Sequence, residues 1–209
     1  MPIDTHPLPS EQPPPIQGER WYHAILNTYG SWIRADERGF RDHDHRFSST
    51  GTYRDLPPPE QHRLLRDWVK RSMKQSEVKL RAEHRELVGR LLLSKLPECD
   101  AKVLALAVGS EHVHVLVRLP RDARTAKARI GNAKRFVSHQ IRSEYPGTFW
   151  GKRCQLKPIR DYEHHSRTFG YILAHGKEGA WVWSYRDAKW RHDSIATDLI
   201  VGVKGLEGA

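Results

Sequence analysis

Two histidines separated by a single residue are the strongest chemical feature of the chain. His112 and His114 flank Val113 within an apolar, β-branched run. In a β-strand alternate side chains point to the same face, about 7 Å apart. Two imidazoles on one side of a rigid strand can bind one divalent cation. The alternative is that both histidines are ordinary polar positions on a half-exposed strand.

A tyrosine and a histidine one helical turn apart form a second candidate pair. Tyr171 and His175 are four residues apart, so in a helix they stand together on one face. Phe169, Ile172 and Leu173 form an apolar stripe on the same segment. A helix docked on a sheet by this stripe could present its phenol and its imidazole to the two strand histidines. The alternative is a half-buried tyrosine, with a histidine that interacts with the helix dipole.

The elements that must position these residues follow from the hydrophobic pattern and from turn residues. The predicted order is strand, two helices, β-hairpin, helix, strand and helix. In residue numbers the prediction is a strand at 21–29, a polar loop at 39–59, a helix from about 59, a helix ending before 97, strands at 102–108 and 111–119, a helix at 123–144, a strand at 154–159 and a helix at 161–175 ended by Gly176. We therefore expect an α+β fold, with helices packed on a ferredoxin-like antiparallel sheet.

Composition restricts the class of protein further. The net charge is +10 over 209 residues, and a basic domain attracts polyanions, of which nucleic acid is the commonest. Cys99 and Cys154 are too few for a disulfide framework, which favours a cytoplasmic location. No apolar run is long enough to span a membrane. Clustered prolines predict a disordered leader at 1–18, followed by one domain at 19–190 and a C-terminal tail at 191–209.

Together these features resemble the single-tyrosine HUH transposases of small bacterial insertion sequences and their relatives associated with repeated extragenic palindromes. The likeness covers roughly residues 20–185. It is carried by the first strand from Tyr22 to Trp32, by Glu111-His112-Val113-His114, by the basic Ala133-Lys134-Arg135-Phe136 followed by Phe149-Trp150, and by Tyr171, which lies 59 residues after His112.

The resemblance implies an enzyme with a HUH-type fold, a metal site and a tyrosine nucleophile. His112 and His114 would bind Mg²⁺ or Mn²⁺, and His175 would complete the coordination. That third position is often glutamine in the family, so a histidine there could favour softer metals. Tyr171 would attack single-stranded DNA, become linked to a 5′ phosphate and release a 3′ hydroxyl. Because a phenol with a pKa of about 10 is a weak nucleophile at neutral pH, the metal would have to polarise the phosphate.

The expected DNA partner is a single strand that forms a hairpin or palindrome. We expect phosphate contacts from cations of the 123–144 helix and base stacking on exposed aromatic side chains. The residues concerned are Lys127, Lys134, Arg135, Arg142, Trp150 and Trp32. The alternative for the basic helix is a solvated face. The resemblance also allows a homodimer that exchanges the tyrosine helix, or a monomer.

Other histidines and tyrosines fit the pattern less well. His43 and His45 lie in the polar loop, with no strand to fix them, and the pair His164-His165 is expected at the surface or facing DNA. Tyr145 and Tyr162 lack a ligand one turn later. Two rival functions remain at this point: a non-catalytic nucleic-acid-binding domain derived from such a transposase, and a metal-dependent hydrolase that acts through activated water.

Overall fold

The computed structural model describes residues 18–33, 36, 60 and 62–187 of the chain. Its elements are β1 (Glu19–Thr28), α1 (Arg63–Ser72), α2 (Ala82–Glu98), β2 (Lys102–Val108), β3 (His112–Pro120), α3 (Ala123–Gln140), β4 (Trp150–Pro158), α4 (Tyr162–Ala174), the 3₁₀ helix η1 (His175–Glu178) and β5 (Trp181–Ser184). The strands form one sheet in the order β4-β1-β3-β2-β5, and each neighbouring pair is antiparallel. The predicted α+β fold is confirmed. Its first four strands follow the ferredoxin-like order, and β5 extends that sheet.

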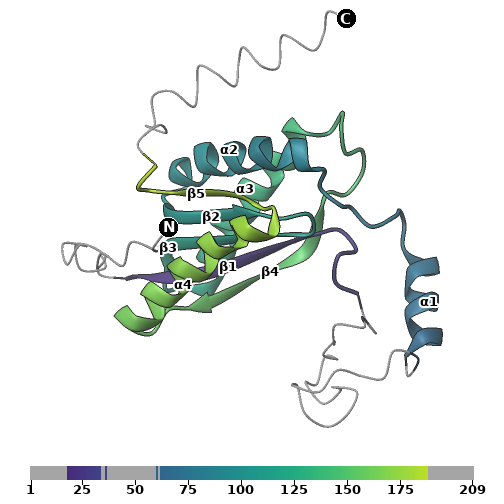
Figure 1. The fold of residues 1–209 in the computed structure, drawn as a ribbon, viewed down its shortest axis with the longest axis horizontal. Coiled ribbons are helices and arrows are strands. Elements are labelled where there is room, and N and C mark those ends of the chain that lie inside the picture. Colours follow the sequence, from purple (N-terminus) through teal and green to yellow (C-terminus); the bar gives the residue numbers. More distant parts are fainter. Residues whose placement is uncertain (1–17, 34–35, 37–59, 61, 188–209) are drawn as a thin grey trace, which may run out of the picture.

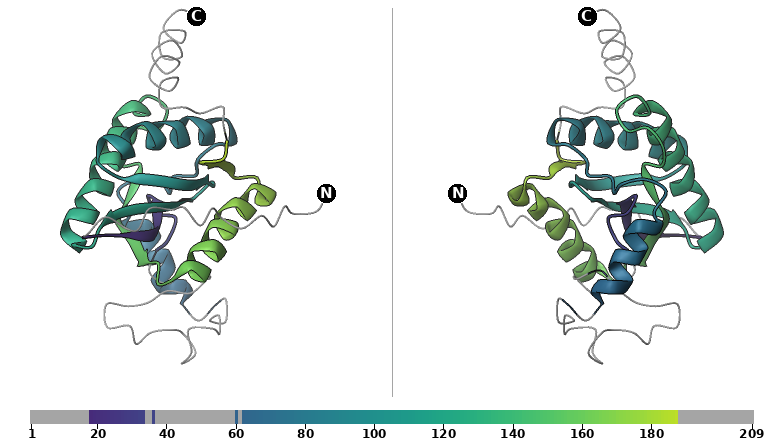
Figure 2. Two further views of the ribbon diagram at one scale, coloured as in Figure 1. Left: turned by 90° about the vertical axis from the view of Figure 1, so that its left-hand side faces the viewer. Right: turned by 90° about the vertical axis from the view of Figure 1, so that its right-hand side faces the viewer.

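Helices α2 and α3 cover one face of the sheet (Figures 1 and 2). Because side chains alternate along a strand, Val113, Val115 and Val117 of β3 all point into this layer. Leu92 of α2 and Ile130 of α3 are fully buried against them. This layer is the main hydrophobic core, and it holds β3 in the middle of the sheet.

Helix α4 lies on the opposite face (Figure 2). It packs through Phe169, Ile172 and Leu173, as the apolar stripe predicts. The strand residues beneath it include Ala105 and Ala107, whose small side chains allow the helix to approach the sheet closely. The same face therefore carries both the tyrosine helix and the alternate residues of β3.

The ends of α4 agree only in part with the prediction. Asp161 caps the helix, since its carboxylate accepts a hydrogen bond from the His164 amide at 2.7 Å. The α-helix ends at Ala174 and continues as η1, which Gly179 ends with a φ of +81°. The prediction that Gly176 ends this helical segment is therefore wrong. The left-handed backbone that favours glycine occurs at residue 179.

Several other boundaries differ from the predicted ones. Helix α2 includes Pro97 in its last turn, where the Leu96 carbonyl still accepts a bond from the Ala101 amide at 3.0 Å. Helix α3 ends at Gln140, and β4 begins at Trp150. Strand β5 was not predicted, because its existence depends on pairing with β2, distant in sequence.

The remaining expectations concern helix α1, the two cysteines, membrane-spanning segments and the ends of the chain. Helix α1 has no buried residue and projects away from the sheet (Figure 1). Both Cys99 and Cys154 are free thiols. Within the described residues, no helix has the length and apolar character needed to cross a bilayer. The leader up to residue 17, the loop with His43 and His45, and the tail at 191–209 lie outside the described residues.

Candidate active site

The two predicted residue pairs meet on the α4 face of the sheet. The ring centroids of His112 and His114 lie 4.7 Å apart, and those of His114 and His175 lie 4.5 Å apart. The Tyr171 ring stands edge-on to both, at 4.7 Å from His175 and 5.4 Å from His114. All four side chains belong to one chain. Strand alternation puts His112 beside His114, and helical spacing puts Tyr171 beside His175, as the sequence predicts.

Each of two central imidazoles has a hydrogen-bond partner at its Nδ1 atom. His175 Nδ1 lies 3.0 Å from a carboxylate oxygen of Glu178. An ionised carboxylate can only accept, so His175 donates from Nδ1, and in the neutral form of the ring Nε2 carries a lone pair. His114 Nδ1 lies 2.8 Å from Nε2 of His23, on β1. If His114 donates in that bond, its own Nε2 also keeps a lone pair, as a metal ligand requires.

The Nε2 atoms of His114 and His175 are both buried, and neither has a hydrogen-bond partner. A buried polar atom left in this state costs about 1–3 kcal/mol, a cost that a bound cation or water would remove. His165 also has an unpartnered Nε2, so one such atom is not diagnostic. His114 and His175, however, border the same cavity of about 110 Å³. Its other lining residues are Arg85, Ala107, Gly109, Ser110, His112, Glu178 and Ala180.

Burial keeps the central imidazoles neutral. Burial, followed by electrostatic repulsion from His112, His23, His175 and Lys157, lowers the pKa of His114 from 6.5 to about 2. Burial, followed by the charge of Lys157, lowers the pKa of His23 from 6.5 to about 4. At neutral pH both rings are therefore uncharged, which is the form of imidazole that binds metals.

The donors suit a divalent cation by their chemistry, since imidazole nitrogen is a common ligand of Fe²⁺, Ni²⁺ and Zn²⁺. As the side chains stand, no three His, Cys, Asp or Glu residues within the described ranges are arranged to hold a metal. The rings of His114 and His175 stack at 6° to one another, so their in-plane lone pairs lie in separate parallel planes. One ring must turn before both can reach the same ion.

Tyr171 is the accessible member of the cluster. Its side chain is 51% exposed, whereas His114 is 5% exposed. A large ligand can therefore reach the phenol beside the buried imidazoles. The alternative tyrosines lie elsewhere: Tyr145 accepts a hydrogen bond from the Arg81 amide at 2.9 Å, and Tyr162 is at the opposite end of α4.

The cations predicted to contact DNA lie on the other side of the sheet from Tyr171. Lys127 and Arg135 are exposed on α3, and Arg142 is exposed just beyond its end. Helices α3 and α4 cover opposite faces (Figure 2). These three residues can meet nucleic acid only on a surface separate from the one that carries Tyr171. Trp32 is 53% exposed, and its stacking on bases stays a prediction.

Two other predicted DNA contacts are corrected by burial. Lys134 is 9% exposed, and its ammonium donates to the Gly151 carbonyl at 2.7 Å. Trp150 is 6% exposed, and its indole N–H donates to the Lys134 carbonyl at 2.9 Å. Both side chains join α3 to β4. His165, expected at the surface, is likewise buried, edge-on to Trp21 at 5.3 Å.

Three residues near the cluster had no predicted role. His23 and Lys157 face each other across the β1–β4 pair, and Glu178 follows His175 by three residues. The alternation of β1 places His23 opposite to Tyr22, Ala24 and Leu26, which enter the main core. Only the pairing of β1 with β3, however, brings His23 to His114.

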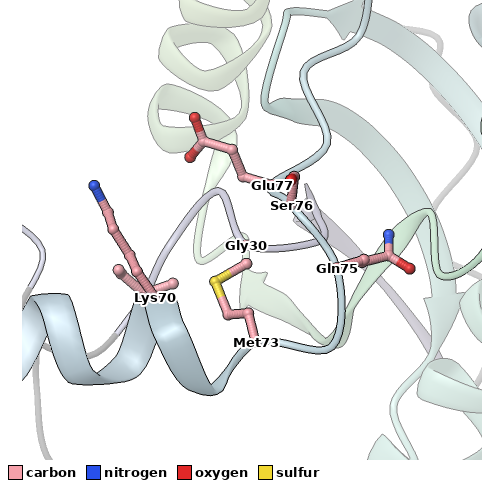
Figure 3. Close-up of a pocket in the computed structure, with 7 residues that line it drawn as sticks. Gly30, Lys70, Met73, Gln75, Ser76 and Glu77 are labelled. Carbon is pink, nitrogen blue, oxygen red and sulfur yellow. The ribbon is translucent and has the colours of Figure 1, made fainter.

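A second cavity, of about 490 Å³, lies between the end of β1 and the segment that follows α1 (Figure 3). Its lining residues are Gly30, Ile33, Lys70, Met73, Gln75, Ser76 and Glu77. It shares no lining residue with the histidine cavity, and its described lining includes no histidine, cysteine or tyrosine. Of these two cavities, the histidine cavity is therefore the one whose described lining offers metal-binding imidazole side chains.

Comparison with known proteins gives little further information. No protein-family model matches the sequence, and no curated protein matches it. The chain is similar to a solved structure of a REP-associated tyrosine transposase bound to a REP hairpin, with a TM-score of 0.42 and 14% identity, over 92% of this chain and 88% of that one. A likeness this weak carries no argument about function, which must come from the site itself.

Proposed function

We propose that this chain is a metal-dependent nuclease and strand transferase of the single-tyrosine transposase kind, which cuts and rejoins single-stranded DNA through a phosphotyrosine. The observation that carries the proposal is the meeting of the exposed Tyr171 ring with the buried ring of His114 and the half-buried ring of His175. The sequence resemblance described above independently assigns the same residues to this chemistry.

In this proposal His112, His114 and His175 hold a divalent cation. The resemblance favours Mg²⁺ or Mn²⁺, and three imidazole donors favour Mn²⁺ over Mg²⁺. When bound, the cation would neutralise charge that develops on the scissile phosphate. Glu178 and His23 would hold the ligand rings through their Nδ1 atoms.

Tyr171 supplies the nucleophile. Its hydroxyl oxygen attacks the phosphorus, forming a bond to the 5′ phosphate as the bond to the 3′ oxygen breaks. The phenol proton passes to solvent, which reaches this half-exposed side chain, and the departing 3′ oxygen takes up a proton. Attack by a 3′ hydroxyl on the phosphotyrosine reverses these steps, rejoining DNA and regenerating the phenol. The number of phosphoester bonds is conserved, so no other energy source is needed.

The exposed phenol also separates this proposal from its two rivals. A hydrolase that acts through activated water needs the histidines but not Tyr171, and a binding domain needs neither. A phenol ring packed against the imidazole rings of His114 and His175 favours covalent chemistry. Because one chain contributes every residue of the site, exchange of α4 between two copies is not required for this geometry, and a dimer remains a prediction.

The test is a covalent adduct between the protein and DNA. The protein is incubated with Mn²⁺ and a randomised pool of hairpin-containing single-stranded oligonucleotides, labelled at either end, and separated under denaturing conditions. The 3′-labelled fragment should stay with the protein, and the 5′-labelled fragment should be released with a free 3′ hydroxyl. Tyr171→Phe should abolish the adduct, while Tyr162→Phe, on the same helix, should retain it.

Each rival predicts a different result. Cleavage that persists without an adduct in Tyr171→Phe would identify a hydrolase. DNA binding without cleavage in the presence of each of Mg²⁺, Mn²⁺ and Zn²⁺ would identify a non-catalytic domain.

A further inference from the structure

The edge strand β4 and the loop after it are unusually basic. Between Tyr145 and Asp161 the chain has four cations and no acidic residue. These are Lys152, Arg153, Lys157 and Arg160. All four are exposed, and the ion pairs formed among described residues include none of them. The side chains are therefore available to a partner that carries negative charge.

The register of the sheet decides which face receives these charges. Lys157 lies opposite His23 and Gln155 lies opposite Ile25, and directly opposed residues of an antiparallel pair share a face. Arg153 precedes Cys154 at the point where the β1–β4 register shifts, and its side chain is exposed. Cys154 and Leu156, in between, turn the other way and pack against the main core. Strand β4 thus directs Gln155 and Lys157 to the face of the histidine cluster, and the exposed Arg153 lies two residues before Gln155.

Helix α4 leaves this part of the face open. It packs mainly over β2, β3 and β5, and it also contacts β1 through Trp21 and His23. The outward side chains of β4, at the edge of the sheet, remain exposed. A phosphate that reaches Tyr171 must lie on this face, and its neighbouring phosphates need cations there. The cations of α3 face the other way.

We infer that the outward face of β4, formed by Arg153, Gln155 and Lys157, binds the phosphates of the DNA single strand that enters the site at Tyr171. This inference rests on the proposed function and names the surface that holds its substrate. Arg153 and Lys157 contact phosphates, and the amide of Gln155 can bond to a phosphate or a base between them. The α3 face is not part of this contact.

Two double variants of equal charge test the inference. Arg153→Gln with Lys157→Gln changes the β4 face, and Lys127→Gln with Arg142→Gln changes the α3 side; each removes one arginine and one lysine. Affinity is measured by fluorescence anisotropy in EDTA, with the same hairpin-containing single-stranded pool, across a range of salt concentrations. The β4 variant should bind about tenfold more weakly at low salt. Its salt-dependence slope should fall by about 1.4, since each phosphate contact on a single strand contributes about 0.7.

The α3 variant should change affinity less than twofold. Equal losses in the two variants, or a larger loss in the α3 variant, would overturn the inference while leaving the adduct chemistry of the proposed function intact. Failure of the wild-type protein to bind single-stranded DNA would overturn both. Duplex DNA of matched sequence is the comparison probe, and tighter binding to it than to the single strand would also overturn the inference.

A structural role for the β4 cations predicts a different outcome. Charged residues on an edge strand can prevent it from pairing with another chain. In that case the β4 variant would associate, as measured by light scattering, and would retain its DNA affinity, which would overturn the inference. We expect instead a variant that keeps its thermal unfolding temperature and recovers adduct formation at saturating DNA, because Tyr171 and the histidines are unchanged.

Discussion

The two faces of the sheet bury different kinds of side chain, although the same strands build both. On the α2–α3 face, β3 contributes Val113 and Val115 to a continuous apolar core. On the α4 face, the alternate residues His112 and His114 meet other imidazoles and a phenol. His114 and Val115 are adjacent in sequence and both at most 5% exposed, yet they lie in separate layers.

This difference shows how a small domain can hold reactive side chains rigidly. Strand β3 is hydrogen-bonded to β1 on one side and to β2 on the other, and the valines fix it against the helices. The histidine backbone is therefore held by the apolar face, so that the opposite face is free to carry polar groups. Sites built on such elements are held more precisely than sites on loops.

The largest effect is expected on Mn²⁺ affinity, in a comparison of two single variants at adjacent positions. His114→Ala removes a proposed ligand and should weaken Mn²⁺ binding about 100-fold or more, since removal of a residue that only supports a ligand typically costs 10- to 100-fold. Val115→Ala should lower the free energy of unfolding by about 2 kcal/mol and leave Mn²⁺ affinity within about twofold. Electron paramagnetic resonance of free Mn²⁺ and denaturant unfolding measure the two quantities. If both variants lose metal affinity equally, the separation of the faces is wrong.

A smaller effect on the same face is expected from His23. His23→Phe removes the group that can accept a hydrogen bond from His114 Nδ1, and should weaken Mn²⁺ binding by about 10- to 100-fold. His23→Gln places an amide oxygen near the lost nitrogen and should restore most of the affinity. A purely structural role for His23 would not give this rescue.

The control for His23 is another histidine that is buried on this face. Burial also lowers the pKa of His165, but its ring packs on Trp21, outside the cluster. His165→Phe should therefore leave Mn²⁺ affinity unchanged. Equal losses in His165→Phe and His23→Phe would show that both act only through packing.

The smallest effects distinguish the helices that cover the two faces. A Cβ atom at Gly89 of α2 would clash with the Trp181 ring, so Gly89→Ala should destabilise the fold by about 1–3 kcal/mol through overpacking. A Cβ atom at Gly170 of α4 meets no described atom within 4 Å, so Gly170→Ala should stabilise the protein by about 0.5–1 kcal/mol. Thermal unfolding of both variants measures the difference, and the same sign in both would contradict it.

Much of the fold could be predicted because its signals are local. Alternation defined β3, the turn at Gly109-Ser110 defined the hairpin, and the capping carboxylate of Asp161 defined the start of α4. Helix ends and β5 were harder to predict. Pro97 lies in a last turn where its missing N–H does little harm, and β5 exists only through pairing with β2.

The candidate site divides in the same way. The sequence by itself determined that His112 shares a face with His114 and that Tyr171 stands one turn from His175, because both relations follow from backbone geometry within one element. Only the tertiary structure decided that these pairs meet, that His23 bonds to His114, and that Lys157 of β4, rather than the cations of α3, shares their face. Those relations depend on strand register and on the side of the sheet that each helix covers, which are set by contacts between residues far apart in the chain.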